Sequence, residues 1–402
     1  MRVLYLTPRL PYPPNRGDTA RTFNILRFLA RRHAVTLVSL VDRADTAADL
    51  GPLRRWCREV RLVPNPATFA AVRGALALLR GHPVSVGYFG RHPMHHAVAS
   101  VVEHGAFDAV LVMSSALAQY LPACRDMRRV VDMVDVDSEK WRQFARHSPA
   151  PARWLYAVEA ERIARIESAL VDQADALVVV SPVELDLYRR LRRSDGSIRV
   201  VGDGVDASWF APPPPVESAG ARLLFTGALD YRPNIDAVSW FVTAILPEIR
   251  RHVPDVRFTA VGHRPVASLL TLAGRSRGQL EIFGSVPDIR PYFSGASVYV
   301  APLRMGRGVK VKMLEAMAMG MPIVGTAVAA EGLAIRHGVE LLRADSAADF
   351  AAAVVEVLRD GAKRRALAAQ ARRTVERDFR WEAQLAPLDD ILAPPAAAKV
   401  RA

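Results

Sequence analysis

Short apolar runs rich in β-branched residues alternate with longer helical patterns along most of this chain. In the first half the runs lie at 3–7, 34–41, 60–63, 109–113, 130–134, 177–181 and 198–201. Near-continuous apolar strands separated by helices are typical of parallel sheets that are covered on both faces. The first half is therefore predicted to form a doubly wound α/β domain.

The alternation stops at Ala211, where four consecutive prolines favour a semi-rigid spacer over a helix or a central strand. It then restarts, and 402 residues suffice for two cores. We predict an α/β protein with two tandem doubly wound Rossmann-like domains that face an interdomain cleft. The expected segments are an N-terminal domain at 1–206, a Pro-rich linker at 207–221, a C-terminal domain at 222–378, a terminal helix at 379–393 that returns to the N-terminal domain, and a mobile tail at 394–402. The strands expected in the second domain are 223–226, 256–261, 280–283, 297–301 and 322–325.

The charge is strongly positive, with a formal net charge of +13 carried by arginines scattered through the helices. Such a charge attracts nucleic acid, anionic lipid and phosphorylated small molecules alike. No basic motif interleaved with aromatic residues indicates nucleic acid, so we expect none as a partner. Peripheral contact with the cytoplasmic face of a membrane stays open.

Cysteine usage and the first residues indicate the compartment. Cys57 and Cys124 are the only cysteines and lack CxxC spacing, so neither a disulfide framework nor a thiolate metal site is expected. The apolar run at 1–7 meets Pro8 and is too short for a signal-peptide core or a membrane span. We expect a cytoplasmic protein, with the inner membrane surface as an alternative location.

The segment 301–322 has the layout of an anion site: an apolar strand, a glycine turn and a helix that ends at Gly320. Helix N-termini at the carboxyl ends of parallel strands present free N–H groups to anions. Gly306 and Gly308 permit close backbone approach, and Lys310 adds charge suited to a diphosphate. Lys312 and Glu315 share one helix face, where they could serve a nucleoside diphosphate or form an ordinary intrahelical pair; the residues alone leave both readings equally open.

The run KMLEAMAMGMPIV at 312–324 resembles the K-x-x-E-A-M-A-x-G-x-P-V-V segment of the GT4 family of glycosyltransferases, which have the GT-B fold. The segment 201–206 is similar to the N-G-V-D segment that closes the family's first domain, with Asp203 in place of Asn. Further similar segments follow in the family's order at 225–227, 230–234 and 282–288. Within the family, the runs at 131–141 and 230–237 resemble exopolysaccharide sugar transferases of PEP-CTERM/exosortase systems.

The resemblance implies a retaining hexosyltransferase whose N-terminal domain receives the acceptor and whose C-terminal domain binds a nucleoside-diphosphate sugar. It implies no metal and no cofactor, since basic side chains and a helix dipole can neutralise the departing diphosphate. The acceptor is expected to be a glycan or a lipid-linked saccharide in exopolysaccharide biosynthesis. The implied donor-binding residues are Gly227, Arg232, Gly308, Val309, Lys310, Lys312 and Glu315.

Two positions depart from the family. The family commonly has Glu-x7-Glu, in which the first Glu contacts donor-sugar hydroxyls, but Arg307 stands at that position and cannot accept hydroxyl hydrogen bonds. Many relatives also have a histidine beside the reaction centre, where this chain has Val134 or Asp135. Asp135 is the candidate catalytic residue; its alternative is a hydrogen-bonded acid in a strand-end turn.

The loop that follows the first strand supplies the acceptor-side candidates. Gly17 permits a tight turn and Asp18 can cap a helix that begins near Thr19, which is a sufficient structural explanation. The resemblance places this glycine loop at the cleft. We therefore predict Gly17 and Asp18 as acceptor or cleft residues, with Arg21 on the following helix as a further candidate.

Two other features have ordinary explanations. His92, His95 and His96 include an i, i+4 pair but no convincing third metal ligand, so a solvated helix face is favoured. The apolar stretch 67–79 could enter a membrane interface, but a buried core or interdomain helix is favoured.

Two alternative functions remain. The first is a catalytically impaired GT-B protein that acts as an assembly component of a polysaccharide synthesis complex; Arg307 and the absent histidine motivate it. The second is another GT-B enzyme, such as a sugar-nucleotide epimerase, which would not account for the donor-loop resemblance.

Overall fold

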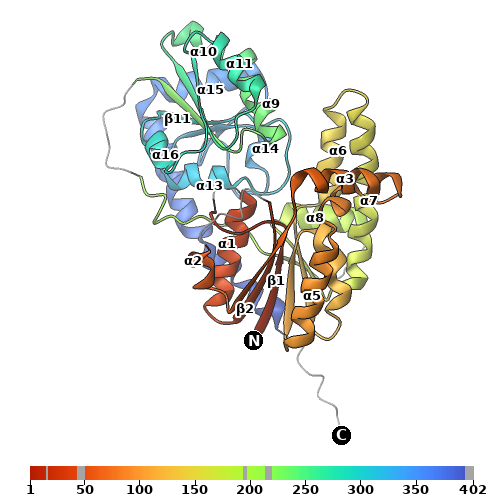
Figure 1. The fold of residues 1–402 in the computed structure, drawn as a ribbon. Coiled ribbons are helices and arrows are strands. Elements are labelled where there is room, and N and C mark those ends of the chain that lie inside the picture. Colours follow the sequence, from red (N-terminus) through yellow and green to blue (C-terminus); the bar gives the residue numbers. More distant parts are fainter. Residues whose placement is uncertain (15–16, 43–49, 193–196, 213–219, 394–402) are drawn as a thin grey trace. The chain divides into compact units, whose positions relative to one another are not determined.

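The computed structural model describes residues 1–14, 17–42, 50–192, 197–212 and 220–393 (Figure 1). These residues form two compact units, one of Met1–Gly202 with the chain from Leu385 onward, the other of Asp203–Gln384. The prolines at 213–215 and the tail at 394–402 lie outside the described residues. None of the described helices is long and apolar enough to cross a membrane.

The first unit is built on a parallel seven-stranded sheet with the order β3-β2-β1-β4-β5-β6-β7. Its central strands are buried along nearly their whole length, as the apolar runs predict. Every strand predicted in this half is present. The strands are β1 (Arg2–Thr7), β2 (Ala34–Val41), β3 (Glu59–Pro64), β4 (Ala109–Met113), β5 (Arg128–Val134), β6 (Ala176–Val179) and β7 (Ile198–Val200).

Helices connect these strands. The connection from β1 to β2 is α1, whose buried residues include Ile25, Leu26 and Leu29. The other helical segments of the first unit are α2 (Gly51–Arg54), α3 (Ala67–Leu79), α4 (Val84–Phe89), α5 (His92–His104), the 3₁₀ segment η1 (Ser115–Ala123), α6 (Asp137–Arg146), α7 (Ala152–Gln173), α8 (Pro182–Arg192) and α18 (Pro387–Leu392), after α1 (Gly17–Ala30).

The second unit repeats this plan with a parallel six-stranded sheet of order β10-β9-β8-β11-β12-β13. The two-residue edge strand β13 (Leu342–Arg343) was not predicted, because so short a run carries no periodicity. The other strands are β8 (Arg222–Thr226), β9 (Arg257–Val261), β10 (Leu280–Phe283), β11 (Val298–Ala301) and β12 (Ile323–Gly325). The helical segments are α9 (Arg232–Trp240), the π-helical η2 (Phe241–Ile245), α10 (Leu246–His252), α11 (Ala267–Arg275), α12 (Arg290–Ser294), α13 (Val311–Ala318), α14 (Ala327–Ala330), α15 (Ala347–Arg359), α16 (Gly361–Asp378) and α17 (Trp381–Leu385).

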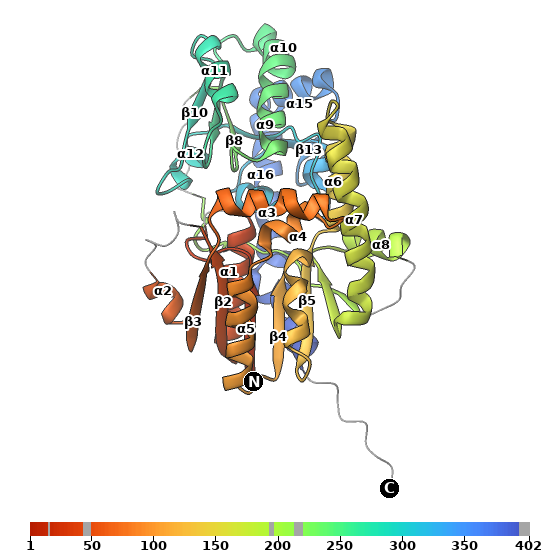
Figure 2. The same ribbon diagram turned by 45° about the vertical axis from the view of Figure 1, so that its right-hand side comes forward.

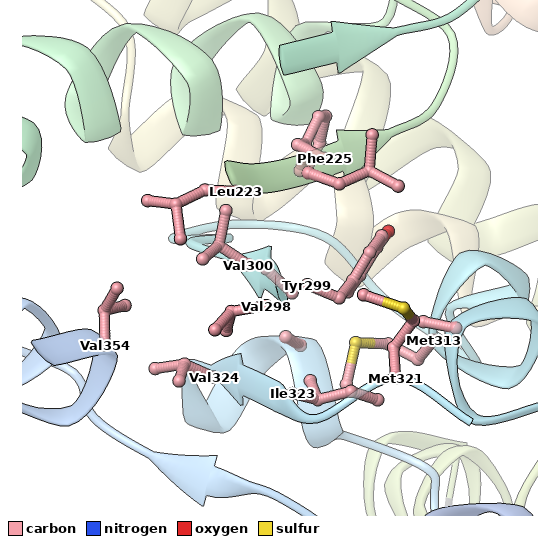
Figure 3. Packing of buried hydrophobic residues seen from close by; sticks show 14 of the residues in the cluster. Leu223, Phe225, Val298, Tyr299, Val300, Met313, Met321, Ile323, Val324 and Val354 are labelled. Atoms are coloured by element: carbon pink, nitrogen blue, oxygen red, sulfur yellow. The ribbon is translucent and has the colours of Figure 1, made fainter. Parts of the chain in front are cut away.

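The core of the second unit lies between its sheet and the surrounding helices. Figure 3 shows Met313 of α13 beside Tyr299 of β11, with Met321 close to both. All three side chains are buried, as is Val354 of α15 on the other side of the strands. Because β11 and α13 pack tightly into this core, the start of α13 has a fixed position relative to the strand ends.

The chain enters the second unit at Asp203 and leaves it after Gln384. Val205, which we expected in the first domain, forms a parallel bridge with Arg380, and Arg290 stacks on the Trp209 ring at 3.8 Å. The single terminal helix expected at 379–393 is wrong: α17 and α18 are two short helices. Pro387 in the first turn of α18 explains the break, since proline lacks the N–H that would continue α17.

Helix α3 corrects our expectation of a buried helix. Its small residues Ala70, Gly74 and Ala77 are buried, whereas its large apolar side chains face outward, with exposed fractions from 44% for Leu76 to 82% for Leu79. Figure 2 shows α3 lying crosswise at one end of the first sheet, beside α4. A Cβ at Gly74 would lie 2.9 Å from Val84, so the small residues serve close packing with α4.

A buried ion pair joins α1 to β5. Arg21 Nε donates to Asp132 Oδ2 at 2.9 Å, and both side chains are at most 1% exposed. Arg21 also donates to the carbonyls of Val201 and Gly202. The other Asp132 oxygen accepts the N–H of Val134, whose φ of 66° is a left-handed conformation that β-branched residues rarely adopt.

Removing one member of this pair should strongly destabilise the first unit. We expect Asp132→Ala to lower the free energy of unfolding by about 3–5 kcal/mol, because it leaves the Arg21 charge buried without its counter-ion. Urea denaturation followed by circular dichroism measures this change. Asp18→Ala, which removes an exposed ion pair with Arg9, is the control and should cost at most about 1 kcal/mol. Equal losses in the two variants would contradict the assignment.

Candidate functional site

The strand order places a candidate ligand site in the second unit. The order reverses between β8 and β11, which are neighbours in the sheet but are followed by connections that run in opposite directions. Ligands of open α/β sheets bind outside the carboxyl ends of the strands at such a reversal. The two loops of interest therefore follow β8, at 227–231, and β11, at 302–310.

The loop after β8 begins with a glycine that the structure requires. Gly227 has a φ of 143°, and a Cβ there would lie 2.5 Å from Lys312 Nζ and 2.8 Å from Asn234 Nδ2. Gly262, at the end of the neighbouring β9, approaches so closely that its Cβ would lie 1.8 Å from the Gly227 carbonyl oxygen. Side chains are thus excluded from this strand end, and the backbone of Gly227 lies beside Lys312.

The loop after β11 is held from the side of β12. Thr326 Oγ1 donates to the Leu303 carbonyl, and the Thr326 N–H donates to the Ala301 carbonyl at 3.2 Å. Gly306 and Gly308 have φ values of 130° and 66°, so both predicted glycines occupy conformations that favour glycine. Lys310 is the N-cap residue of α13, and its ammonium donates to the Gly308 carbonyl at 2.6 Å.

Lys312, on the first turn of α13, reaches across to the loop after β8. Its ammonium donates to Asn234 Oδ1 and lies 4.4 Å from the centre of the Phe225 ring. Asn234 is held in turn, because its Nδ2 donates to the Ala228 carbonyl at 2.8 Å. The sequence reasoning identified Lys312 and Gly227 but not the supporting role of Asn234, which belongs to the motif-bearing run 230–234.

Burial perturbs both charged residues of α13 in opposite directions. It lowers the pKa of Lys312 to about 7, although the Glu315 carboxylate opposes part of the shift. It raises the pKa of Glu315 to about 7, and there Lys312 opposes the shift. Desolvation outweighs the attraction between the two groups, so the pKa of each is displaced toward neutrality.

The positions of the remaining donor-side candidates, Arg232 and Val309, say less about ligand binding. Arg232 is the first residue of α9, at the end of the loop after β8, and Val309 is half-buried before Lys310. Arg307 donates from Nη1 to Glu331 Oε1 at 2.6 Å. Glu331, at the C-cap of α14, was not among the predicted site residues, because no local motif connects it to the loop after β11.

Asp135 follows the strained residue Val134 at the end of β5 and is half-buried. Its N–H donates to the Met133 carbonyl at 2.8 Å. This carboxyl end of β5 is an edge at which α/β proteins place functional groups. The geometry agrees with either reading of Asp135, so its catalytic role stays a prediction.

The acceptor-side candidates lie on α1. The helix begins at Gly17, two residues before the predicted start, and Asp18 in its first turn pairs with Arg9. Arg21 is buried in its ion pair with Asp132. This pairing is sufficient explanation for Arg21, and its part in acceptor binding stays a prediction.

No metal centre is found in the part of the chain that the structure describes: no group of three or more His, Cys, Asp or Glu side chains there could hold a metal ion. His92 and His96 of α5 lie with their ring centres 6.3 Å apart, and His95 packs on the Tyr120 ring. The thiols of Cys57 and Cys124 are free and buried, and burial raises the pKa of each to about 12.

Solved structures with the same two-unit plan cover nearly the whole chain. Sucrose-phosphate synthase from Thermosynechococcus elongatus matches with a TM-score of 0.74 and 19% identity, over 97% of this chain and 98% of its own. Anabaena HepE in complex with UDP-glucose matches with a TM-score of 0.67 and 14% identity, over 98% and 99% of the two chains. The fold is GT-B. The predicted fold class is thereby confirmed.

Sequence comparison points to the second unit. Residues 220–360 match the family model described as "Glycosyl transferases group 1", which confirms the predicted resemblance for that part of the chain. Phosphatidyl-myo-inositol mannosyltransferase of Mycolicibacterium smegmatis is 31% identical over 205 residues, which are 49% of this chain and 52% of that protein. The chain spans from about a third to about half the length of the first curated relatives that it matches.

The pKa of Lys312 predicts how anion binding depends on pH. Above about pH 7 the free ammonium loses its proton and must regain it to pair with an anion, so affinity should fall as pH rises. For the best binder among UDP, GDP and ADP, calorimetry between pH 7.5 and 8.5 should show a loss of up to about tenfold per pH unit. Lys312→Arg keeps its charge, so the affinity of that variant should fall much less over this pH range. A decline as steep in that variant would show that another group titrates.

Proposed function

We propose that this chain is a retaining glycosyltransferase that moves a hexose from a nucleoside-diphosphate sugar to a glycan acceptor. The observation that carries the proposal is the meeting of two glycine-rich strand ends at Lys312, which Asn234 and the Phe225 ring hold in place. These strand ends have backbone N–H groups, a helix N-terminus and cations, the groups that bind phosphates. The family match of residues 220–360 supports the same reading.

In this proposal the residues of α13 and of the loop before it each bind a different part of the donor. Gly308, Val309 and Lys310 present backbone and charge to the diphosphate, and Lys312 neutralises the negative charge that grows on it as the glycosidic bond breaks. Arg232 contributes a second positive charge from the start of α9. Glu315 accepts hydrogen bonds from the ribose hydroxyls. Such a mechanism needs positioning and charge stabilisation more than a side-chain nucleophile.

On the acceptor side, Gly17, Asp18 and Arg21 are proposed to border the acceptor, and Asp135 to assist its hydroxyl. We further propose a lipid-linked saccharide acceptor in exopolysaccharide biosynthesis, of the PEP-CTERM-associated kind. A relative from Klebsiella pneumoniae, 24% identical over 140 residues, is described as an uncharacterized 44.6 kDa protein in the cps region. The second candidate function is an assembly component without turnover, which the arginine at 307 favours.

Nucleotide binding tests the donor site directly. We expect one of UDP, GDP and ADP to bind the wild-type protein and the Lys312→Ala, Glu315→Ala double variant to bind it at least about a hundredfold more weakly, because a charge-assisted contact to phosphate and another to ribose are lost. Isothermal calorimetry measures both affinities, with Arg251→Ala on α10 as a control for loss of positive charge. If folded wild-type protein binds none of the three, the transferase proposal fails. Binding without hydrolysis or transfer would favour the assembly role.

The location of a lipid-linked acceptor suggests a membrane partner for α3. Phe69, Val72, Leu76 and Leu79 recur at helical spacing and are between 44% and 82% exposed. Residues 60–102, which include α3, α4 and α5 as far as Val102, contain no aspartate or glutamate but four arginines, at 61, 73, 80 and 91; Glu103 follows in the last turn of α5. An apolar helix face within a stretch that carries only positive charge fits the surface of an anionic bilayer.

Polar contacts hold the apolar face of α3 in place, which favours a docking surface over a helix that is merely loosely packed. Arg162 of α7 donates to the Leu78 and His82 carbonyls at the end of α3, at 2.8 Å each. Glu159 of α7 accepts the N–H groups of Val84 and Ser85 at the start of α4. The α3–α4 pair is thus fastened to α7 through polar contacts, while the apolar side chains point the other way.

Vesicle binding tests this partner. We expect the protein to co-sediment with vesicles of phosphatidylcholine mixed with phosphatidylglycerol. Leu76→Ser with Leu79→Ser should weaken the partitioning by about tenfold or more, because two apolar side chains that would enter the bilayer are lost. Arg80→Ser should weaken binding to the anionic vesicles alone, by about fivefold. Leu270→Ser on α11, which is similarly exposed, is the control. If the double variant partitions as strongly as the wild type, the assignment is wrong. If the wild type is a dimer and the double variant is a monomer, α3 is instead an interface with a second copy of the chain.

A further inference from the structure

Glu331 is a carboxylate in an unexpected position. It follows the short helix α14 after β12, the strand next to β11 in the sheet, and points to the loop that precedes α13. Arg307 Nη1 lies 2.6 Å from its Oε1, and Lys310 Nζ lies 3.6 Å from its Oε2. One carboxylate therefore contacts two cations of the loop that the proposed function assigns to the diphosphate.

A negative charge beside a phosphate site needs an explanation, because it repels the phosphate that the cations attract. Simple neutralisation of Arg307 is one explanation. A second is that the carboxylate binds a part of the ligand that carries no charge. The two differ in whether Glu331 is sealed away or still accessible to a ligand.

Exposure favours the second explanation. The side chains of Arg307 and Lys310 are 9% and 8% exposed, whereas that of Glu331 is 23% exposed. The cations are packed on the inner side and the carboxylate lies nearer to solvent. An ionised carboxylate has about four acceptor positions, so it can accept further hydrogen bonds from hydroxyl groups while it contacts both cations.

Hydrogen bonds at both ends of α14 fix the position of Glu331 relative to the loop after β11. Thr326 begins α14, where its hydroxyl accepts the Ala329 N–H, and it also donates to the Leu303 carbonyl in the loop after β11. The Glu331 N–H donates to the Val328 carbonyl at the other end of the same helix. The start of the loop and the residue that contacts its end are thus tied to the same four-residue helix.

We infer that Glu331 binds hydroxyl groups of the donor sugar and that Arg307 and Lys310 orient its carboxylate for this purpose. The inference rests on the proposed function, since it requires that a diphosphate lie at Lys310 and Lys312. A hexose linked to the terminal phosphate would then lie next to the partly exposed side chain of Glu331. Glu331 thereby supplies from α14 the acceptor that Arg307 cannot provide.

The test compares two affinities in each protein. Calorimetry is run with the pairs UDP and UDP-glucose, GDP and GDP-mannose, and ADP and ADP-glucose, and it continues with the pair that the wild type binds. For Glu331→Gln we expect the affinity for the diphosphate alone to stay the same or rise, because a repelling charge is removed. The affinity for the sugar nucleotide should fall by about ten- to a hundredfold relative to that for the diphosphate, since hydroxyl contacts to a charged acceptor are weakened.

A matched control and two contrary outcomes complete the design. Glu248→Gln, which removes an exposed ion pair with Arg251 on α10, should change neither affinity. If Glu331→Gln weakens both ligands equally, or neither, Glu331 serves only to neutralise the loop and the inference is wrong while the donor site stands. If the wild type binds no member of any pair, the proposed function itself fails and the inference fails with it.

Discussion

The reversal of strand order between β8 and β11 is the constraint from which the candidate site follows. Connections from these neighbouring strands leave in opposite directions, and such a reversal is the place where open α/β sheets bind ligands. Only small residues fit at the strand ends, which accounts for the close approach of Gly227 and Gly262. Lys312 fills part of the space that remains, and its neighbours Asn234 and Phe225 come from the two ends of the β8 connection.

Burial then gives Lys312 and Glu315 their chemical character. Each would be an ordinary surface group if α13 lay on an exposed face, yet here each is half-buried, and desolvation displaces its pKa toward neutrality. The attraction between the two offsets part of that cost but not all of it. A dianion beside Lys312 would favour its charged form again, so binding and protonation at this place are coupled. Lys312 and Glu315 share one helix, as predicted, but the Lys312 ammonium donates to Asn234 of the neighbouring loop, and the part of the two residues in ligand binding stays a prediction.

The sequence predicted what depends on local periodicity and on single-residue conformations. Apolar runs located the strands. Gly306 and Gly308 were identified because glycine in a turn before a helix permits close backbone approach, and both have a positive φ in the structure. Contacts between residues distant in the sequence were not predictable in this way. Glu331 reaches Arg307 across two adjacent strand ends, and Asp132 reaches Arg21 over 111 positions. For α3 the apolar content indicated burial, but the pattern could not show that the small residues face the protein and the large ones face away.

The first unit has a strained backbone at Val134, whereas the second has the charged residues with shifted pKa values. Val134 adopts a φ of 66° although its side chain is β-branched, which costs on the order of 1–3 kcal/mol and persists only because the surroundings impose it. The imposing contact is Asp132, which accepts the Val134 N–H and is itself fixed by Arg21. Because Arg21 also holds the carbonyls of Val201 and Gly202, one guanidinium connects α1, the end of β5 and the last residues of the first unit before the chain leaves it. The turn that carries Asp135 is thus set by a buried ion pair, and its position should depend less on Asp135 itself than on the pair beneath it.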